Sequence, residues 1–243
     1  MALVQARGLV RTFGAGRAAR RVLDGADLDV ARGEIVAVLG RSGTGKSTLL
    51  HLLGGLDRPE AGTVEVAGER VTGASERRLS ALRRRHLGFV FQFFHLLPEL
   101  SGEANVLLAG SVRGAHPDAA ARGRALVDRL GLRPVAGTLP AQLSGGEQQR
   151  FAIARALVND PAVVLADEPT GNLDAEAGAE VLRLLRGVAD EGRALVGVPH
   201  DPAATAVADR VLSLVDGRLV ADADAEGRLT SHAPEGRLWA RDP

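Results

Sequence analysis

Short apolar segments along the chain predict a mainly parallel β-sheet. Residues 34–39, 87–91, 162–166 and 194–198 are each mostly apolar, without the alternation of a strand that has one face in water. Strands that are buried on both faces of a parallel sheet have this character. Because helical patterns separate several of these segments, we expect an α/β fold in which helices pack on the sheet.

Segments that alternate between apolar and polar positions predict a second set of strands. Residues 3–6, 26–30 and 63–67 alternate in this way, as half-buried strands do. Residues 211–214 and 218–220 flank an Asp-Gly turn signal, which predicts a closing hairpin.

The strand signals disappear between residues 99 and 160. Helical patterns take their place at residues 104–108, 119–130 and 147–159, so we expect a mostly helical insertion. A further helix is expected at residues 176–189, where apolar positions three and four apart fall on one face.

A glycine-rich segment, GRSGTGKST, follows the apolar run 34–39 and precedes leucines spaced as on one helix face. It matches the phosphate-loop pattern G-x-x-x-x-G-K-[ST] in the expected strand–loop–helix context. Glycines let successive N–H groups turn toward an anion, the lysine reaches the outer phosphates, and the serine hydroxyl can hold Mg²⁺. The candidate nucleotide-binding residues of this phosphate loop are Gly40, Arg41, Ser42, Gly43, Thr44, Gly45, Lys46, Ser47 and Thr48.

Two acids follow the strand predicted at residues 162–166, at the edge of the sheet where ligands of α/β proteins bind. Asp167 is placed to hold Mg²⁺ through water, and Glu168 is placed to orient or deprotonate an attacking water. Paired acids after a strand are also a common way to begin a helix, and alone the two interpretations are balanced. The phosphate loop upstream favours the functional one.

A second glycine pair lies in LSGGEQQR, residues 143–150, directly before a predicted helix. Ser144 can cap that helix, with Glu147 three residues later completing a capping box. The box does not explain Gly145 and Gly146, which cost conformational entropy. Bare amides at a helix start form a second anion site. We infer that this site completes the phosphate pocket of another copy of the chain.

Composition limits the alternatives. With 243 residues, the chain is long enough for one large α/β domain or a domain with an inserted subdomain. Lys+Arg and Asp+Glu are both 30, so no nucleic-acid partner is expected. No apolar run approaches the roughly 18 residues that span a bilayer, and the N-terminus lacks a secretory apolar stretch. We expect a chain that is soluble by itself, in keeping with attachment to a membrane through a partner.

Taken together, the motifs resemble those of the ATP-binding-cassette ATPases. The phosphate loop, Gln92, LSGGEQQR, LADEPTGNLD and His200 occur in the order and spacing of that family, and the match runs through about residues 2–222. The segments GFVFQFFHLLP and DEPTGNLD are similar to the branch that serves lipoprotein release, macrolide export and antimicrobial-peptide export, and to its cell-division relative.

The resemblance implies a phosphate-loop NTPase fold: a RecA-like core with an N-terminal antiparallel β subdomain and an inserted helical subdomain. The expected domain is residues 1–224, the helical subdomain is about residues 97–160, and residues 225–243 form a polar tail. The implied ligands are ATP and Mg²⁺.

The resemblance also implies roles for single residues. Gln92 approaches the magnesium and the water, and His200 contacts the γ-phosphate and helps to hold that water. Phe13, which alone would be interpreted as a core or loop-base aromatic, stacks on adenine. Asp174 bridges two subunits. The expected catalytic residues are therefore Glu168, His200 and Gln92, and the expected Mg²⁺ ligands are Ser47, Gln92 and Asp167.

Ser144, Gly145 and Gly146 are implied to contact the γ-phosphate held by the opposite subunit. Two positions depart from the family pattern. Pro199 precedes His200 where relatives usually have threonine, which removes a backbone donor and restricts Val198 to extended geometry. The usual glutamate directly before Asn105 is absent.

These features predict the ATP-hydrolysing subunit of a membrane transporter of the exporter or mechanotransmission type. The chain is expected in the cytoplasm, on the inner face of the plasma membrane, where a separate permease holds it. Two copies, as a homodimer or pseudo-dimer, would hold two ATP molecules between them. A regulatory cassette of the cell-division type remains an alternative. A soluble cassette acting on DNA or ribosomes is disfavoured by the balanced charge and by the lack of a coiled-coil insertion or second cassette. A kinase or GTPase is disfavoured by LSGGE and by the missing guanine-specificity motif.

Overall fold

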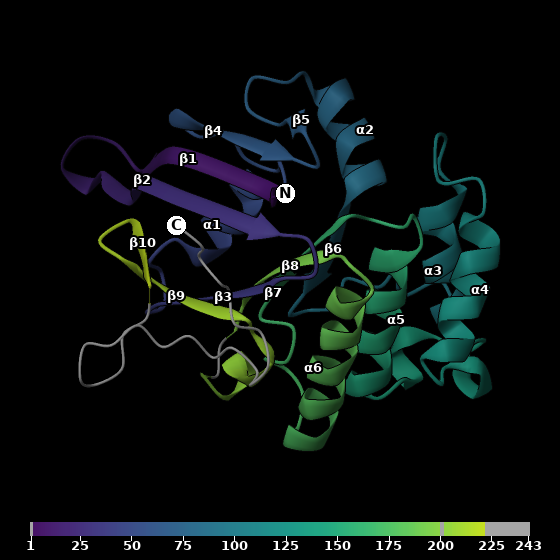
Figure 1. The fold of residues 1–243 in the computed structure, drawn as a ribbon. Helices are drawn as coiled ribbons and strands as arrows, with labels where there is room; N and C mark the ends of the chain where they lie inside the picture. The colour runs from purple at the N-terminus through teal and green to yellow at the C-terminus, as the bar shows by residue number, and fades with distance from the viewer. Residues whose placement is uncertain (1, 200–201, 222–243) are drawn as a thin grey trace, which may run out of the picture.

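The computed structural model describes residues 2–199 and 202–221 (Figure 1). Its centre is a six-stranded sheet with the order β10-β9-β3-β8-β7-β6. The strands β3, β6, β7, β8 and β9 run parallel to one another, and β10 closes the sheet by pairing antiparallel with β9. The bounds are Ile35–Leu39 (β3), Leu87–Phe91 (β6), Val163–Asp167 (β7), Ala194–Val198 (β8), Arg210–Val215 (β9) and Arg218–Ala221 (β10).

A second, four-stranded antiparallel sheet has the order β2-β1-β4-β5. Its strands are Ala2–Phe13 (β1), Arg20–Ala31 (β2), Ala61–Val66 (β4) and Glu69–Arg70 (β5). The strands expected at residues 3–6 and 26–30 are parts of β1 and β2, which are each 12 residues long, so the expected bounds were too short. The pairing of β1 with β2 contains several register shifts. Because each bulge shifts the alternation of side chains, the sequence pattern shows only the regular parts of these strands.

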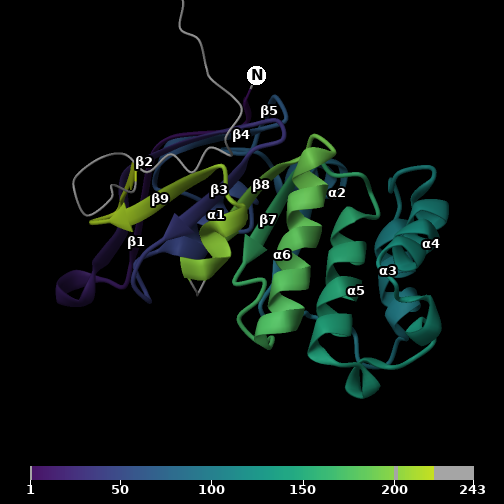
Figure 2. The same ribbon diagram turned by 60° about the horizontal axis from the view of Figure 1, so that its bottom comes forward.

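The helices connect and cover the two sheets. They are Lys46–Leu53 (α1), Glu76–His86 (α2), Gly102–Ser111 (α3), Ala119–Arg129 (α4), Gly145–Leu157 (α5) and Ala175–Asp190 (α6), with short 3-10 turns at Gly16–Ala18, Arg133–Val135, Pro140–Gln142 and Pro202–Val207. Figures 1 and 2 both show α6 and α5 side by side, with α3 and α4 beyond α5. The described residues contain no helix that is long and apolar enough to cross a membrane.

Alternating residues of the central strands serve two cores. In β3, Val36 and Val38 belong to the core that α1 shares with the four-stranded sheet. Ile35 and Ala37 belong to the opposite core, which the strand shares with α3, α4, α5 and α6. The central sheet is therefore buried on both faces, which explains why its strands are continuous apolar runs.

Candidate nucleotide-binding site

The phosphate loop needs its glycines for conformation and for space. Gly40, Gly43 and Gly45 all have positive φ, at 154°, 73° and 112°. A Cβ on Gly45 would lie 2.8 Å from the carbonyl oxygen of Val22 in β2. A Cβ on Gly40 would lie 2.9 Å from the hydroxyl of Thr44. Neither position can accept a side chain without a shift of the surrounding structure.

Lys46 is the first residue of α1 and lies over the loop. Its Nζ donates to the carbonyl oxygen of Gly40 at 2.8 Å and to that of Arg41 at 3.2 Å. The helix itself is anchored by four buried leucines, Leu49, Leu50, Leu52 and Leu53. The residue before the helix is Gly45, which has no side chain to cap the first amides. The ammonium, the amides and the helix dipole together favour a phosphate group at this point.

Two of the three predicted magnesium ligands, Ser47 and Asp167, meet in the structure. Ser47 Oγ donates to Asp167 Oδ1 at 3.2 Å. A hydroxyl and a carboxylate are hard oxygen ligands of the kind that Mg²⁺ takes in phosphate-binding proteins. Within the described residues, no group of three or more His, Cys, Asp and Glu side chains is gathered as a metal site. A Mg²⁺ ion that is completed by nucleotide phosphates and water does not need such a group, so the residues present fit the ion.

Glu168 follows β7 in an unusual backbone conformation. Its φ is 46°, in the left-handed region that a residue with a side chain rarely adopts. Its N–H donates to the carbonyl oxygen of Val198 at 2.8 Å, and its own carbonyl accepts from Gly171 at 3.0 Å. Backbone strain of this kind gathers at functional sites, because the surrounding contacts must hold it. The conformation therefore supports the predicted role of Glu168.

Gln92 lies against the turn that follows Glu168. Its carbonyl oxygen accepts from Asn172 Nδ2 at 2.9 Å. A Cβ on Gly171 would lie 2.8 Å from Gln92 Nε2, so the side chain packs directly over this glycine. The structure thus brings together two residues that the sequence separates widely, the predicted catalytic residues Gln92 and Glu168.

The capping box predicted at the start of α5 is confirmed. Glu147 N–H donates to Ser144 Oγ at 3.3 Å, and the Glu147 carboxylate accepts from Ser144 N–H at 2.8 Å. The glycine pair also has a packing reason that the sequence did not reveal. A Cβ on Gly145 would lie 3.3 Å from Leu173 Cδ2, and one on Gly146 would lie 3.2 Å from Ala177 Cβ. Small residues therefore let α5 begin close to the start of α6.

Three of the predicted site residues remain, namely Asp174, Phe13 and His200. Asp174 caps α6, where its carboxylate accepts from Ala177 N–H at 2.8 Å. Phe13 is 44% exposed and carries the guanidinium of Arg11 5.0 Å from its ring centroid, so it is not a core aromatic. An exposed ring is available for stacking. His200 lies outside the described residues.

Sequence reasoning missed residues that hold the main chain around the site. Besides Asn172, they include Gln149 and Arg155 of α5. Arg155 donates through Nη2 to the carbonyl oxygen of Phe94 at 2.7 Å and through Nη1 to that of His95. Burial lowers the pKa of Arg155 from its ordinary value. A polar residue at a position where the helix turns its apolar face inward is the one signal that could have indicated Gln149.

Comparison with known proteins places this geometry in a family. Residues 23–171 match the family model described as ABC transporter. The lipoprotein-releasing system ATP-binding protein LolD of Bordetella pertussis is 52% identical over 221 residues, which cover 90% of this chain and 96% of that protein. The LolD of Chromohalobacter salexigens is 48% identical, with 91% of this chain and 94% of that protein covered.

Longer relatives and solved structures agree. The macrolide export ATP-binding/permease protein MacB 1/2 of Paracoccus denitrificans is 50% identical over 221 residues, or 90% of this chain. The match spans only 33% of that protein's length. The dimeric structure of MJ0796, a bacterial ABC transporter cassette, has a TM-score of 0.80 and 36% identity, with 89% of this chain and 96% of that chain covered. The predicted fold is confirmed, and the chain belongs to the ABC transporter family as one of its ATP-binding, ATP-hydrolysing cassettes.

Proposed function

We propose that the chain is the ATP-hydrolysing subunit of a membrane transporter and that it drives a permease. The observation that carries this proposal is the cluster at the carboxyl end of β7. There Ser47 Oγ lies 3.2 Å from Asp167, and Glu168 follows in a left-handed conformation. This arrangement combines a phosphate site, a place for a divalent cation and a carboxylate for water at one edge of the sheet.

The chemistry assigned to each residue is mainly positional and electrostatic. Lys46 and the loop amides would hold the phosphates, while Ser47 and Asp167, with Gln92, would hold Mg²⁺. When bound, Mg²⁺ supplies positive charge that offsets the charge developing on the transferred phosphoryl group. Glu168 accepts a hydrogen bond from the attacking water and orients it, and His200 helps to hold the same water.

The site is proposed to be completed by a second copy of the chain. Among the described residues, Ser144 exchanges hydrogen bonds with Glu147 and Gln148 and has none to the phosphate loop. The amides at the start of α5 are thus available to a phosphate held elsewhere. Solved relatives are dimers, including one titled as a post-hydrolysis state bound to ADP and Pi. In a two-fold dimer, Ser144 to Gly146 and Asp174 would face the partner's nucleotide and subunit.

The permease is proposed to dock on the segment that follows Gln92. Phe93 is 66% exposed and Leu97 is 45% exposed, so two large apolar side chains lie open to solvent close together in the chain, and grouped apolar side chains of this kind mark interaction surfaces. The printed names of the relatives concern lipoprotein release and macrolide export. We therefore place the chain with exporter-type systems, on the inner face of the plasma membrane through its permease, and leave the regulatory cell-division type aside. No nucleic-acid partner is proposed.

The proposal is tested by Glu168→Gln in the full chain. This change keeps the size of the side chain but removes the carboxylate that faces the water. We expect ATP hydrolysis to fall by about a hundredfold or more, since a positioned acid or base contributes on the order of 10²–10⁴-fold. With Mg-ATP present, light scattering should show a stable dimer. Hydrolysis at the wild-type rate, or a protein that stays monomeric under these conditions, would contradict the proposal.

A further inference from the structure

Helix α5 carries a fully buried polar side chain that faces the site. Gln149 is 0% exposed. In the described part of the chain, Asn105, at 2% exposed, is the only other polar or charged residue that is buried. Its neighbours on the helix, Phe151, Ala152 and Ile153, are buried and apolar. A glutamine in such surroundings must find hydrogen-bond partners or lose free energy relative to its hydrated state.

The amide of Gln149 finds its partners at the ends of two catalytic strands. Its Nε2 donates to the carbonyl oxygen of Pro169 at 2.6 Å and makes a longer contact of 3.5 Å with that of Phe91. Pro169 follows Glu168 in the chain, and Phe91 precedes Gln92. One NH₂ group therefore spans the ends of β6 and β7, immediately beside both predicted catalytic residues.

The main chain at these points needs external support. Glu168 has a φ of 46°, and beyond Gln92 both Phe94 and His95 have positive φ, at 46° and 51°. Such conformations persist only where surrounding contacts fix them. Helix α5 supplies contacts to both regions, through Gln149 at Phe91 and Pro169 and through Arg155 at Phe94 and His95.

The carbonyl oxygen of the same side-chain amide does not share in these contacts. Gln149 Oε1 is buried and has no hydrogen-bond partner among the residues that the structure describes. Two carbonyl oxygens lie on the side of Nε2, so turning the amide over would place three acceptors against one another. An apolar side chain of similar volume would avoid an unpaired acceptor. The polarity of residue 149 is therefore poorly explained by stability alone and is explained by the two carbonyl oxygens that it holds.

We propose that Gln149 is a positioning residue for ATP hydrolysis. It fixes the main chain beside Gln92 and Glu168 to α5, the helix whose first residues, Ser144 to Gly146, are assigned to the partner's nucleotide. The proposal rests on the proposed function. In this arrangement, α5 and the water-orienting groups form one rigid unit. The same unit places the start of α5 at one nucleotide and the water-orienting groups at the other.

The test compares Gln149→Met with Gln148→Met in the full chain. Methionine keeps the length of the side chain but has no N–H to donate. Gln148 is the matched control, because its amide, on the same helix, donates to Leu143 rather than to a catalytic strand. We expect Gln149→Met to lower kcat by about tenfold or more, because small misplacements of reacting groups are costly. The dissociation constant for a fluorescent ATP analogue should stay within about threefold, since ground-state binding is kept.

A double-mutant cycle with Gln92→Ala separates positioning from general damage. If Gln149 acts through the placement of Gln92, its replacement should cost less in kcat when Gln92 is already absent. Equal kcat for wild type and Gln149→Met, or a loss of kcat on Gln149→Met that is the same with and without Gln92, would overturn the inference. Should Gln149→Met not fold, as judged by circular dichroism, Gln149→Asn replaces it, with an amide too short to reach both oxygens. An inactive wild-type chain would instead refute the proposed function.

Discussion

The hydroxyl of Ser47 donates a hydrogen bond to Asp167, although the two residues are 120 positions apart in the chain. The contact joins the first turn of α1 to the end of β7. A cation that takes oxygen ligands from both residues is consequently held by two elements that are each anchored in the core between the sheets.

Replacement of Ser47 should weaken the use of Mg²⁺ more than the use of ATP. In Ser47→Ala, one oxygen ligand is lost while the loop and its amides stay in place. We expect the half-saturating Mg²⁺ concentration in an ATPase assay to rise about tenfold or more, since loss of supporting interactions around a metal costs 10–100-fold in affinity. Ser47→Thr keeps the hydroxyl and should stay close to wild type. An unchanged Mg²⁺ requirement in Ser47→Ala would argue against the assigned ligand.

Lys46 is the only lysine in the chain, which gives a direct test of where phosphate binds. Its ammonium contacts the carbonyl oxygens of Gly40 and Arg41 over the loop. We expect an amine-directed reagent to modify Lys46 and bound Mg-ATP to slow that modification, as measured by mass spectrometry of the peptide. The N-terminal amine provides an internal control, because its modification should not depend on ATP. Modification of Lys46 that ATP does not slow would contradict the assignment.

Gly45 should be intolerant of even one methyl group. Its φ of 112° is strained for alanine, and the added Cβ would lie 2.8 Å from Val22 O. We expect Gly45→Ala to lower the free energy of unfolding by about 1–3 kcal/mol. Gly137→Ala is the control, because no atom in the described part of the chain lies within 4 Å of its added Cβ and its φ is not positive. Urea denaturation of both variants measures the difference, and equal stabilities would refute the steric argument.

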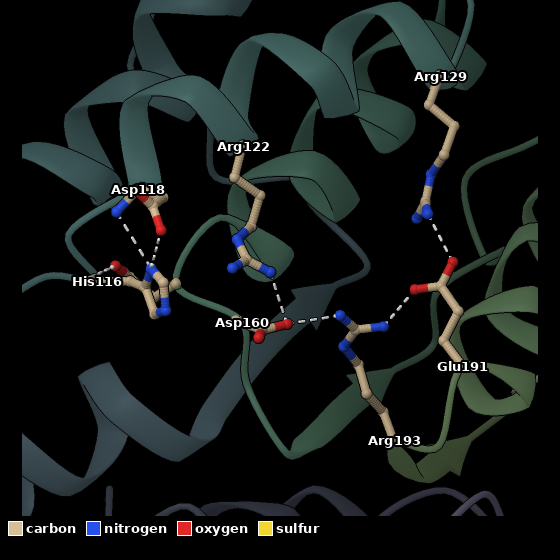
Figure 3. A network of polar contacts seen from close by, with 8 residues as sticks. His116, Asp118, Arg122, Arg129, Asp160, Glu191 and Arg193 are labelled. Atoms are coloured by element: carbon tan, nitrogen blue, oxygen red, sulfur yellow. Dashed lines mark hydrogen bonds and ion pairs between the residues drawn. The ribbon is translucent and has the colours of Figure 1, made fainter.

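An ion network ties α4 to the turn between α6 and β8 (Figure 3). Asp160 pairs with Arg122 of α4 and with Arg193, each at 2.7 Å. Arg193 also pairs with Glu191, which reaches Arg129 of α4 at 2.5 Å. Burial by itself would raise the pKa of Asp160, but the hydrogen bond from Arg193 and the charges of Arg122, Arg193 and His116 outweigh it, so the pKa is lowered.

The lowered pKa fixes the direction of a pH effect. A carboxyl whose pKa is lower in the folded state stabilises the protein above its unfolded value of about 3.9, and this contribution is lost as the pH falls through the folded value. Asp160→Asn should therefore cost about 1 kcal/mol at pH 7 and progressively less below about pH 4. Asparagine suits the φ of 56° at this position, so the backbone is kept. Denaturant midpoints of both proteins at several pH values measure the effect; a difference that does not shrink in acid would exclude it.

The sequence predicted the elements whose patterns are local. Residues 87–91 and 194–198 form strands with the predicted bounds, because continuous apolar runs of that length have few other solutions in an α/β protein. The Ser144 capping box was also predictable, since all of its atoms lie within four consecutive residues. The phosphate-loop motif likewise carries its own strand–loop–helix context.

Contacts between distant segments were beyond prediction from one sequence. The packing of Gln92 over Gly171 and the reach of Gln149 to Pro169 depend on which strands are neighbours in the sheet. The sequence predicted an anion site as the reason for Gly145 and Gly146, and their closeness to Leu173 and Ala177 gives them a structural reason as well. The roles assigned to the site residues remain predictions, and His200 falls outside the described part of the chain.

The walls of the phosphate loop come from opposite ends of the chain. A Cβ on Gly45 would strike Val22 of β2, and one on Gly40 would lie 3.2 Å from the carbonyl oxygen of Leu214 in β9. The shape of the nucleotide pocket therefore depends on residues that lie far outside the motif in the sequence. Transferring the motif to another sheet would move its amides without the neighbouring strands that fix the conformation of the loop. Removing the first strands would deform the pocket even though every residue of the motif remained.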